Sequence, residues 1–209
     1  MFPVNRFVIV LCCLAIGWLV LAAVPCRADM LNTLFNANNG QAGNMFDTNV
    51  LASGGIRIEA LELNLDPGDW DAELWTLNGT YAGNETNPAV WTLRDSFSGL
   101  TSAGFDNPTA WDIVDFNLAA GAEAFYVRVS NGSGMNYTNG SSEGALFVED
   151  ANLQIFQGTG NAGFFGNQFR PRIWNGSIMY TVIPEPSALA LLATGCIAML
   201  LRRSSRREW

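Results

Sequence analysis

Apolar and polar residues alternate in short runs along the middle of the 209-residue chain, and clusters of Gly and Asn separate the runs. Between residues 56 and 65 the apolar positions recur at every second residue, first in one phase and then, after Ala60, in the other. Because successive side chains of a strand point to opposite faces, this pattern predicts a β-strand with a bulge near Ala60. The following Asp66-Pro67-Gly68-Asp69 predicts a turn, with residues 72–77 as the returning partner strand.

Several later runs rich in Val, Ile, Phe and Trp have the same strand-like character. Asn175-Gly176 separates residues 172–174 from 178–182, and Asn-Gly between apolar residues is a strong signal of a β-hairpin. Eight to ten short strands without long helical stretches favour an all-β fold, an antiparallel β-sandwich with the jelly roll as one form of it. The other expected strands are residues 90–97, 111–118, 124–130, 145–148 and 153–157.

The first 28 residues have the order of a secretory signal peptide. Arg6 precedes the apolar stretch 7–24, and Cys26-Arg27-Ala28 puts small residues at the two positions that a signal peptidase reads. We therefore expect residues 1–28 to be removed, so that the exported protein begins at Asp29. An uncleaved N-terminal anchor is the alternative, whereas Val24-Pro25 before Cys26 argues against lipid attachment.

The last residues, 184–209, combine a proline motif, an apolar run and a basic end. The prolines of Pro184-Glu185-Pro186 favour an extended backbone, which a processing protease can bind. The apolar residues 188–201 would rise only about 21 Å as a helix, against roughly 30 Å of bilayer hydrocarbon, and so predict one short transmembrane helix. The basic residues after it are expected to remain in the cytoplasm as a topology anchor, and they are Arg202, Arg203, Arg206 and Arg207.

This order of proline motif, short apolar helix and basic end closely resembles the PEP-CTERM sorting signal of Gram-negative bacteria. The resemblance covers only the tail 184–209, in which all three parts are present in order. It implies processing by an exosortase near the proline motif, transient anchoring in the inner membrane, and delivery to the cell surface or to an extracellular matrix that contains exopolysaccharide. An ordinary permanent anchor would share the helix and the charges but not the proline motif. The exported domain is then the single segment 29–183.

The segment 29–183 lacks the residues on which many enzyme chemistries depend. All four cysteines lie outside it, and the whole chain contains neither histidine nor lysine. A disulfide framework, serine–histidine hydrolysis, a zinc site and a phosphate-binding lysine are thereby excluded. Its 17 acidic residues outnumber its five arginines and give a net charge of −12, so we expect no nucleic-acid partner.

Acidic pairs are the one route to catalysis that the composition leaves open. Asp112 with Asp115, or Glu149 with Asp150, could supply the two carboxylates of a glycosidase. Neighbouring acids on a strand point to opposite faces or lie far apart, so these pairs fit surface charge better. We predict that the protein is not an enzyme.

Four strings of residues are spread over most of the exported segment: 44–47 (NMFD), 81–92 (YAGNETNPAVWT), 136–140 (NYTNG) and 171–176 (PRIWNG). They look like a recurrent domain of secreted bacterial surface proteins, a family with no established activity or ligand. This second resemblance implies one β-rich extracellular module and nothing catalytic.

Two sets of residues are candidates for ligand binding. Asp66, Asp69 and Asp71 gather carboxylates in one turn, and carboxylate oxygens are the ligands that calcium prefers, although the spacing is not that of an EF-hand and acidic turns are usually only solvated. Exposed aromatic rings beside Asn and Asp can stack on sugar rings, which makes Trp70, Tyr81 and Tyr137 the candidates for glycan contact. Most tryptophans of the exported segment are expected in the core, with Trp70, in the turn, the best candidate for exposure.

Six Asn-x-Ser/Thr sequons are candidates for glycosylation, three of them in residues 130–143, which are expected to form a loop. In a bacterial chain rich in Asn, Ser and Thr, chance explains most such triplets. The sequon residues are Asn78, Asn84, Asn131, Asn136, Asn139 and Asn175.

The sequence as a whole favours an exported structural or adhesive protein of the cell surface or biofilm matrix. The alternative is a carbohydrate-binding, lectin-like module. Calcium is the only candidate cofactor in either case.

Overall fold

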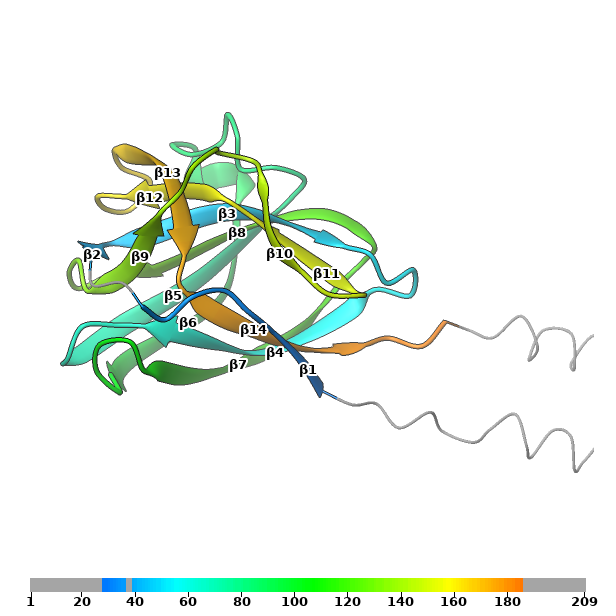
Figure 1. Ribbon diagram of the computed structural model, residues 1–209, viewed down its shortest axis with the longest axis horizontal. Helices are drawn as coiled ribbons and strands as arrows, with labels where there is room; N and C mark the ends of the chain where they lie inside the picture. The colour runs from blue at the N-terminus through cyan, green and yellow to red at the C-terminus, as the bar shows by residue number, and fades with distance from the viewer. Residues whose placement is uncertain (1–27, 37–38, 186–209) are drawn as a thin grey trace, which may run out of the picture. The chain divides into compact units, whose positions relative to one another are not determined.

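The computed structural model describes residues 28–36 and 39–185, which form β-strands, their connections and one short 3₁₀-helix, η1 (Pro88–Val90) (Figure 1). Arg27–Ile183 make up one compact unit. Among the described residues no helix is long and apolar enough to cross a membrane, and the helix expected at 188–201 lies outside them. The signal peptide, apart from Ala28, lies outside them as well.

Fourteen strands in the described part of the chain form two antiparallel sheets. The small sheet has the order β1 (Ala28–Asn32), β14 (Gly176–Val182), β4 (Ile56–Asn64) and β7 (Pro108–Leu118). The large sheet has the order β2 (Asn39–Gln41), β9 (Met135–Asn139), β13 (Gln168–Trp174), β12 (Gly158–Asn161), β3 (Gly43–Val50), β8 (Gly121–Val129), β5 (Asp69–Asn78) and β6 (Thr92–Thr101). A branch of the large sheet consists of β11 (Leu153–Phe156), which pairs with β3, and β10 (Leu146–Glu149).

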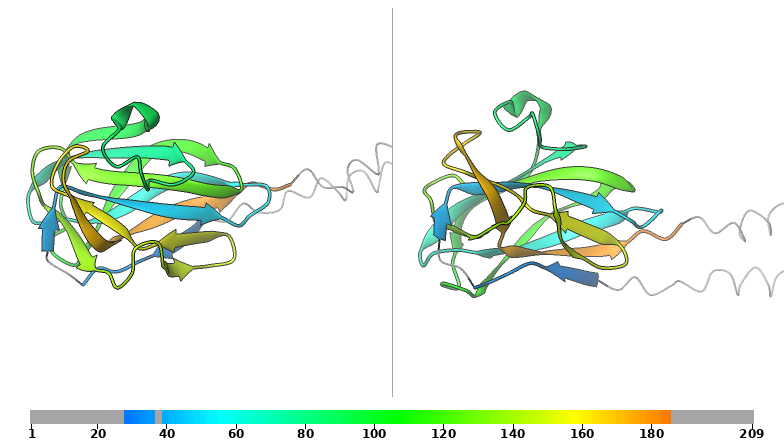
Figure 2. Two further views of the ribbon diagram at one scale, coloured as in Figure 1. Left: turned by 90° about the horizontal axis from the view of Figure 1, so that it is seen from above. Right: turned by 45° about the horizontal axis from the view of Figure 1, so that its top comes forward.

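One hydrophobic core lies between the two sheets and takes side chains from both. Ile58 and Ile178 enter it from the small sheet, and Phe46 and Val127 from the large one. The predicted all-β, antiparallel fold is therefore confirmed, and the two sheets pack in a sandwich-like arrangement (Figure 2). The jelly-roll strand order stays a prediction.

Strand β8 shows why part of the chain reads as a continuous apolar run. Phe125 and Val127 face the core between the sheets, whereas Ala124 and Tyr126 belong to a second cluster with Tyr81. Because both faces of β8 are covered, its side chains are buried without alternation.

The bulge predicted near Ala60 is confirmed. The pairing register of β4 shifts between Ile58 and Ala60 against β7, and the register of β14 shifts opposite the same point. Glu59 is the extra residue against β14, whereas against β7 the extra residues lie in β7, between Asp112 and Phe116. The apolar side chains on both sides of the bulge face the core.

Both predicted hairpins are wrong, because each turn carries the chain from one sheet to the other. The turn at Asp66 leaves β4 in the small sheet and leads into β5, which pairs with β6 and β8 instead of β4. Asn175 likewise separates β13 in the large sheet from β14 in the small one. Neither Asn175 nor Gly176 has the positive φ that a type I′ hairpin turn needs.

Buried contacts hold Asn175 in this crossing. Its side chain is fully buried, and its Oδ1 accepts a hydrogen bond of 3.1 Å from Thr138 Oγ1. Its carbonyl oxygen accepts from the Asn64 backbone N–H at 3.3 Å. A Cβ on Gly176 would lie 2.4 Å from the Glu62 carbonyl oxygen, so only glycine fits beside β4.

The structure holds more strands than the eight to ten predicted, because segments whose Gly and Asn content predicts turns also form strands. Strands β2, β3 and β12 are the clearest cases. Gly158 is buried in β12, where a Cβ would lie 2.0 Å from the Met45 carbonyl oxygen of β3. Glycine here permits a close approach of two strands.

The two predicted processing points lie at the same end of the domain. Strand β1 pairs with β14, which sets Ala28 opposite Thr181 (Figure 1). After β14 the Ile183 backbone N–H donates to the Gly55 carbonyl oxygen, and Pro184 and Glu185 are exposed without regular structure. Pro186 and the arginines of the tail lie outside the described residues.

Candidate functional site

The three carboxylates predicted to bind calcium are not gathered into one site. Asp66 Oδ1 accepts from Asn136 Nδ2 at 2.9 Å, and Asp69 Oδ1 accepts from Thr101 Oγ1 at 2.7 Å. Hydrogen bonds from Ser98 Oγ and then from a backbone N–H lower the pKa of Asp71. Within residues 28–36 and 39–185 no group of three or more acidic residues could hold a metal ion.

Two of the three aromatic candidates for glycan contact are not free to stack on a sugar. Trp70, expected to be exposed, is partly buried; its Nε1 donates to the Asp66 carbonyl oxygen at 2.8 Å. Its ring lies against Gly134, where a Cβ would be 2.0 Å from the ring. Tyr81 is only 2% exposed, and its hydroxyl donates to Glu143 at 2.7 Å. Burial, followed by this hydrogen bond, raises the pKa of Tyr81.

The expectation that most tryptophans of the exported segment fill the core holds for three of the five. Trp91, Trp111 and Trp174 are buried, while Trp70 and Trp75 are partly buried.

The sequons divide into accessible and inaccessible positions. Asn136 and Asn175 are fully buried and hydrogen-bonded, so neither can carry a glycan in the folded domain. The expected loop 130–143 is also wrong in part, because Asn136 and Asn139 lie in β9. The partly or fully exposed sequon residues are Asn78, Asn84, Asn131 and Asn139.

Three of the four acids in the pairs considered for catalysis are engaged in other contacts. Asp115 forms an ion pair with Arg57. Asp150 Oδ2 accepts from the Tyr180 hydroxyl at 2.6 Å, and Glu149 accepts from Gln154 at 2.6 Å.

The third aromatic candidate, Tyr137, lines a pocket of about 420 Å³ at one edge of the large sheet. Strands β2, β9 and β13 meet there, because Tyr137 pairs with Asn39 on one side and with Trp174 on the other. Arg172, two residues before Trp174, is the diagonal neighbour of Tyr137 across β9 and β13. Its guanidinium lies over the Tyr137 ring, 4.8 Å from the centroid. We call this the Tyr137–Arg172 pocket; its other lining residues are Gly40, Gln41, Ala42, Ser133, Ala162 and Phe169.

The Tyr137–Arg172 pocket combines apolar and polar surfaces. Phe169 is 45% exposed on one wall. Gln41 is only 4% exposed, donates from Nε2 to Asn44, and has no protein donor to its buried Oε1. The buried Nε of Arg172 likewise has no acceptor. Buried polar atoms without partners are costly in most folds, and these two atoms are shielded from solvent behind the pocket wall.

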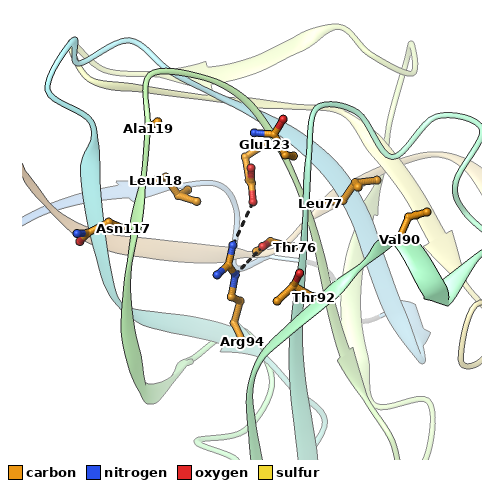
Figure 3. A pocket seen from close by; sticks show the side chains of 10 residues that line it. Thr76, Leu77, Val90, Thr92, Arg94, Asn117, Leu118, Ala119 and Glu123 are labelled. Carbon is orange, nitrogen blue, oxygen red and sulfur yellow. Dashed lines mark hydrogen bonds and ion pairs between the residues drawn. The ribbon is translucent and has the colours of Figure 1, made fainter.

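A second depression, of about 330 Å³, lies where β5 and β6 of the large sheet approach β7 of the small one. Figure 3 shows the Arg94 guanidinium turned toward Glu123 and Thr76. Its Nε donates to Thr76 Oγ1 at 2.7 Å, its Nη2 lies 3.6 Å from a carboxylate oxygen of Glu123, and it stacks over the Phe116 ring. The charge in this depression is therefore balanced within the protein.

Sequence reasoning identified Tyr137 but missed Arg172, Phe169 and Gln41. The strand register that brings them together is not visible in local patterns. The only signal was indirect: two of the strings that resemble the secreted surface domain, 136–140 and 171–176, contain Tyr137 and Arg172 and pair with each other as β9 and β13.

No family model and no curated protein matches the chain. Among solved structures, the cysteine protease and lectin-like domains of Cwp84, a surface layer associated protein of Clostridium difficile, are similar with a TM-score of 0.46 at 12% identity, over 75% of this chain and 36% of that chain. The same clostridial cysteine protease after propeptide cleavage is similar with a TM-score of 0.47 at 12% identity, over 75% and 40% of the two chains. The chain thus spans less than half of those structures, and the likeness is too distant to assign a site or a function.

Proposed function

We propose that the protein is an adhesive module, exported to the cell surface or extracellular matrix, that binds glycan through the Tyr137–Arg172 pocket. The observation that carries the proposal is the pocket itself, which is lined by the exposed Phe169 ring and by the Arg172 guanidinium stacked over Tyr137. In this proposal the module adheres by binding glycan, so the lectin-like alternative from the sequence describes the mechanism of adhesion. Export and sorting rest on the two ends of the chain, as read from the sequence.

The chemistry of the pocket fits a sugar ring. A sugar presents an apolar face of C–H groups and a rim of hydroxyls, which suits a site with an aromatic wall and a few polar groups. Phe169 offers the exposed aromatic surface. A sugar hydroxyl can accept a hydrogen bond from the Arg172 guanidinium, whose one hydrogen bond within the described residues is to the Pro171 carbonyl oxygen.

The position of the pocket in the domain also supports adhesion. Strand β2 and the turn between β12 and β13 lie at the end of the domain opposite the one where β14 leads to Pro184 (Figures 1 and 2). A domain held at its C-terminal end would therefore present the pocket away from its attachment.

Binding is tested with two matched variants of the domain 29–183, whose cores lie wholly between Leu31 and Val182. Phe169→Ala removes the exposed aromatic wall and should weaken glycan binding about tenfold, the usual scale for one stacked aromatic contact. Phe97→Ala removes a side chain of similar exposure, 47% against 45%, from β6 and should change nothing. Glycan arrays followed by calorimetry measure both. Equal affinities for the two variants, or no binding by the unmodified domain, would refute the proposed site.

Sorting is tested in the full-length chain. Replacing Pro184, Glu185 and Pro186 by alanine removes the extended proline motif and should leave the exported protein untrimmed and retained in the inner membrane. Intact mass and cell fractionation report both effects. Trimming and release at the normal level would show that the tail is not read as a PEP-CTERM signal.

A further inference from the structure

We propose that the Tyr137–Arg172 pocket recognises acidic sugars, and that Arg172 receives their carboxylate group. This inference rests on the proposed function and names its ligand class. It follows from the charge state of the pocket within a strongly acidic domain.

Arg172 differs from every other arginine that the structure describes. Four arginines each pair with at least one carboxylate: Arg57 with Asp115, Arg94 with Glu123, Arg128 with Glu73, and Arg170 with both Glu85 and Glu143. Over residues 28–36 and 39–185, Arg172 alone has no carboxylate oxygen within 4.0 Å. It is thus the one uncompensated arginine of the described domain.

Neutral groups hold the Arg172 side chain in place. The Tyr137 ring lies 4.8 Å from the guanidinium carbon, and Nη1 donates to the Pro171 carbonyl oxygen at 2.8 Å, the only hydrogen bond of this side chain within the described residues. A cation–π contact orients the guanidinium without neutralising its charge. An oriented and uncompensated guanidinium is suited to receive an anion.

The surroundings of Arg172 do not compete for its charge. No acidic residue lines the pocket. Asp66 Oδ2 would lie 3.7 Å from a Cβ built on Gly40, a lining residue, but Asp66 forms no ion pair with Arg172 and its Oδ1 accepts from Asn136. Physiological salt screens the attraction of exposed carboxylates that lie more than about 8 Å away.

Two features of the pocket match two groups of one ligand. The uncompensated guanidinium of Arg172 can bind an anion, and the exposed ring of Phe169 can stack on an apolar ring face. A neutral hexose supplies only the apolar face. A uronic acid supplies both groups, because its ring also carries a carboxylate that accepts N–H bonds from a guanidinium.

Calorimetry with oligogalacturonides tests this assignment, because their carboxylates can be methyl-esterified without changing the sugar ring. The free-acid form should bind the domain about tenfold more tightly than the ester, the scale of one charge-assisted hydrogen bond. Arg172→Gln should remove this difference and leave the affinity for the ester unchanged, and Arg172→Lys, which keeps the charge, should retain part of the preference. Arg57→Gln is the matched control, since it removes an arginine from the small sheet, and should behave as the unmodified domain.

The outcomes separate this inference from the proposed function. Equal binding of acid and ester, with both weakened by Phe169→Ala, would overturn the acidic-sugar assignment while the glycan site stands. Preference for a sulfated dextran over the free-acid oligogalacturonide would also overturn it. Absence of binding to any glycan would overturn the proposed function itself. The Arg172 variants remain folded if their thermal unfolding temperatures equal that of the unmodified domain.

Discussion

Replacing Gly158 by alanine is expected to lower the free energy of unfolding by about 3 kcal/mol. The added Cβ would lie 2.0 Å from the Met45 carbonyl oxygen and 2.8 Å from the Phe46 Cα, both backbone atoms of β3. No rotamer change relieves such a contact, so β12 must move away from β3. Because β12 also pairs with β13, this movement disturbs the middle of the large sheet.

Gly163→Ala is the control for that substitution. Nothing lies within 4 Å of a Cβ at this position, and its φ lies outside the positive range in which side chains are strained. Its effect should stay within about 0.5 kcal/mol. Urea unfolding of both variants, followed by tryptophan fluorescence, measures the difference. A loss below about 1 kcal/mol for Gly158→Ala would mean that β12 and β3 are not in close contact.

Truncating Trp174 to alanine is expected to cost about 3 to 5 kcal/mol, the usual range for a buried tryptophan. The side chain is 1% exposed and stacks on Phe46 with ring centroids 4.8 Å apart and an interplanar angle of 13°. It lies where the chain crosses between the sheets, so its loss opens a cavity in the core that joins them.

Val114→Ala serves as the control for the Trp174 variant, because Val114 is 67% exposed and its truncation should change stability by less than about 0.5 kcal/mol. Urea unfolding again provides the measurement. If the alanine variant at Trp174 lost no more stability than the Val114 control, the core between the sheets would not be organised around this ring.

The parts of the fold that the sequence predicted well are those where periodicity alone decides. The strand over residues 56–65, with its bulge, is recovered because one face is buried and the other partly exposed. Strand β8 is recovered because a short apolar run bounded by glycine has few other solutions. These features depend on neighbours in sequence.

The pairing of strands could not be predicted in the same way. Asn175-Gly176 has the composition of a hairpin turn. Asn175, however, is held by hydrogen bonds from Thr138 and Asn64, which are distant in sequence. Glycine in β12 has the local character of a turn residue, because its role, close approach to β3, depends on a partner strand. Tertiary contacts override local turn signals at each of these points.

At the candidate site, too, the sequence predicts residue character but not the tertiary contacts. Aromatic character marked Trp70, Tyr81 and Tyr137 equally, but other segments cover Trp70 and Tyr81 and leave only Tyr137 at a pocket. The uncompensated charge of Arg172 is a property of three strands that meet at one sheet edge. No count of charges along the chain could separate it from the four paired arginines.

Glycan binding in the Tyr137–Arg172 pocket can be located by mapping the contact in solution. Backbone amide shifts of the isotope-labelled domain 29–183 are followed while oligogalacturonide is added. We expect the perturbed amides to cluster in β2, β9 and β13, with Tyr137, Phe169 and Arg172 among them, and the surroundings of Arg94 to stay unchanged. Saturable perturbations centred on Arg94, or none in β9 and β13 at saturation, would contradict this expectation.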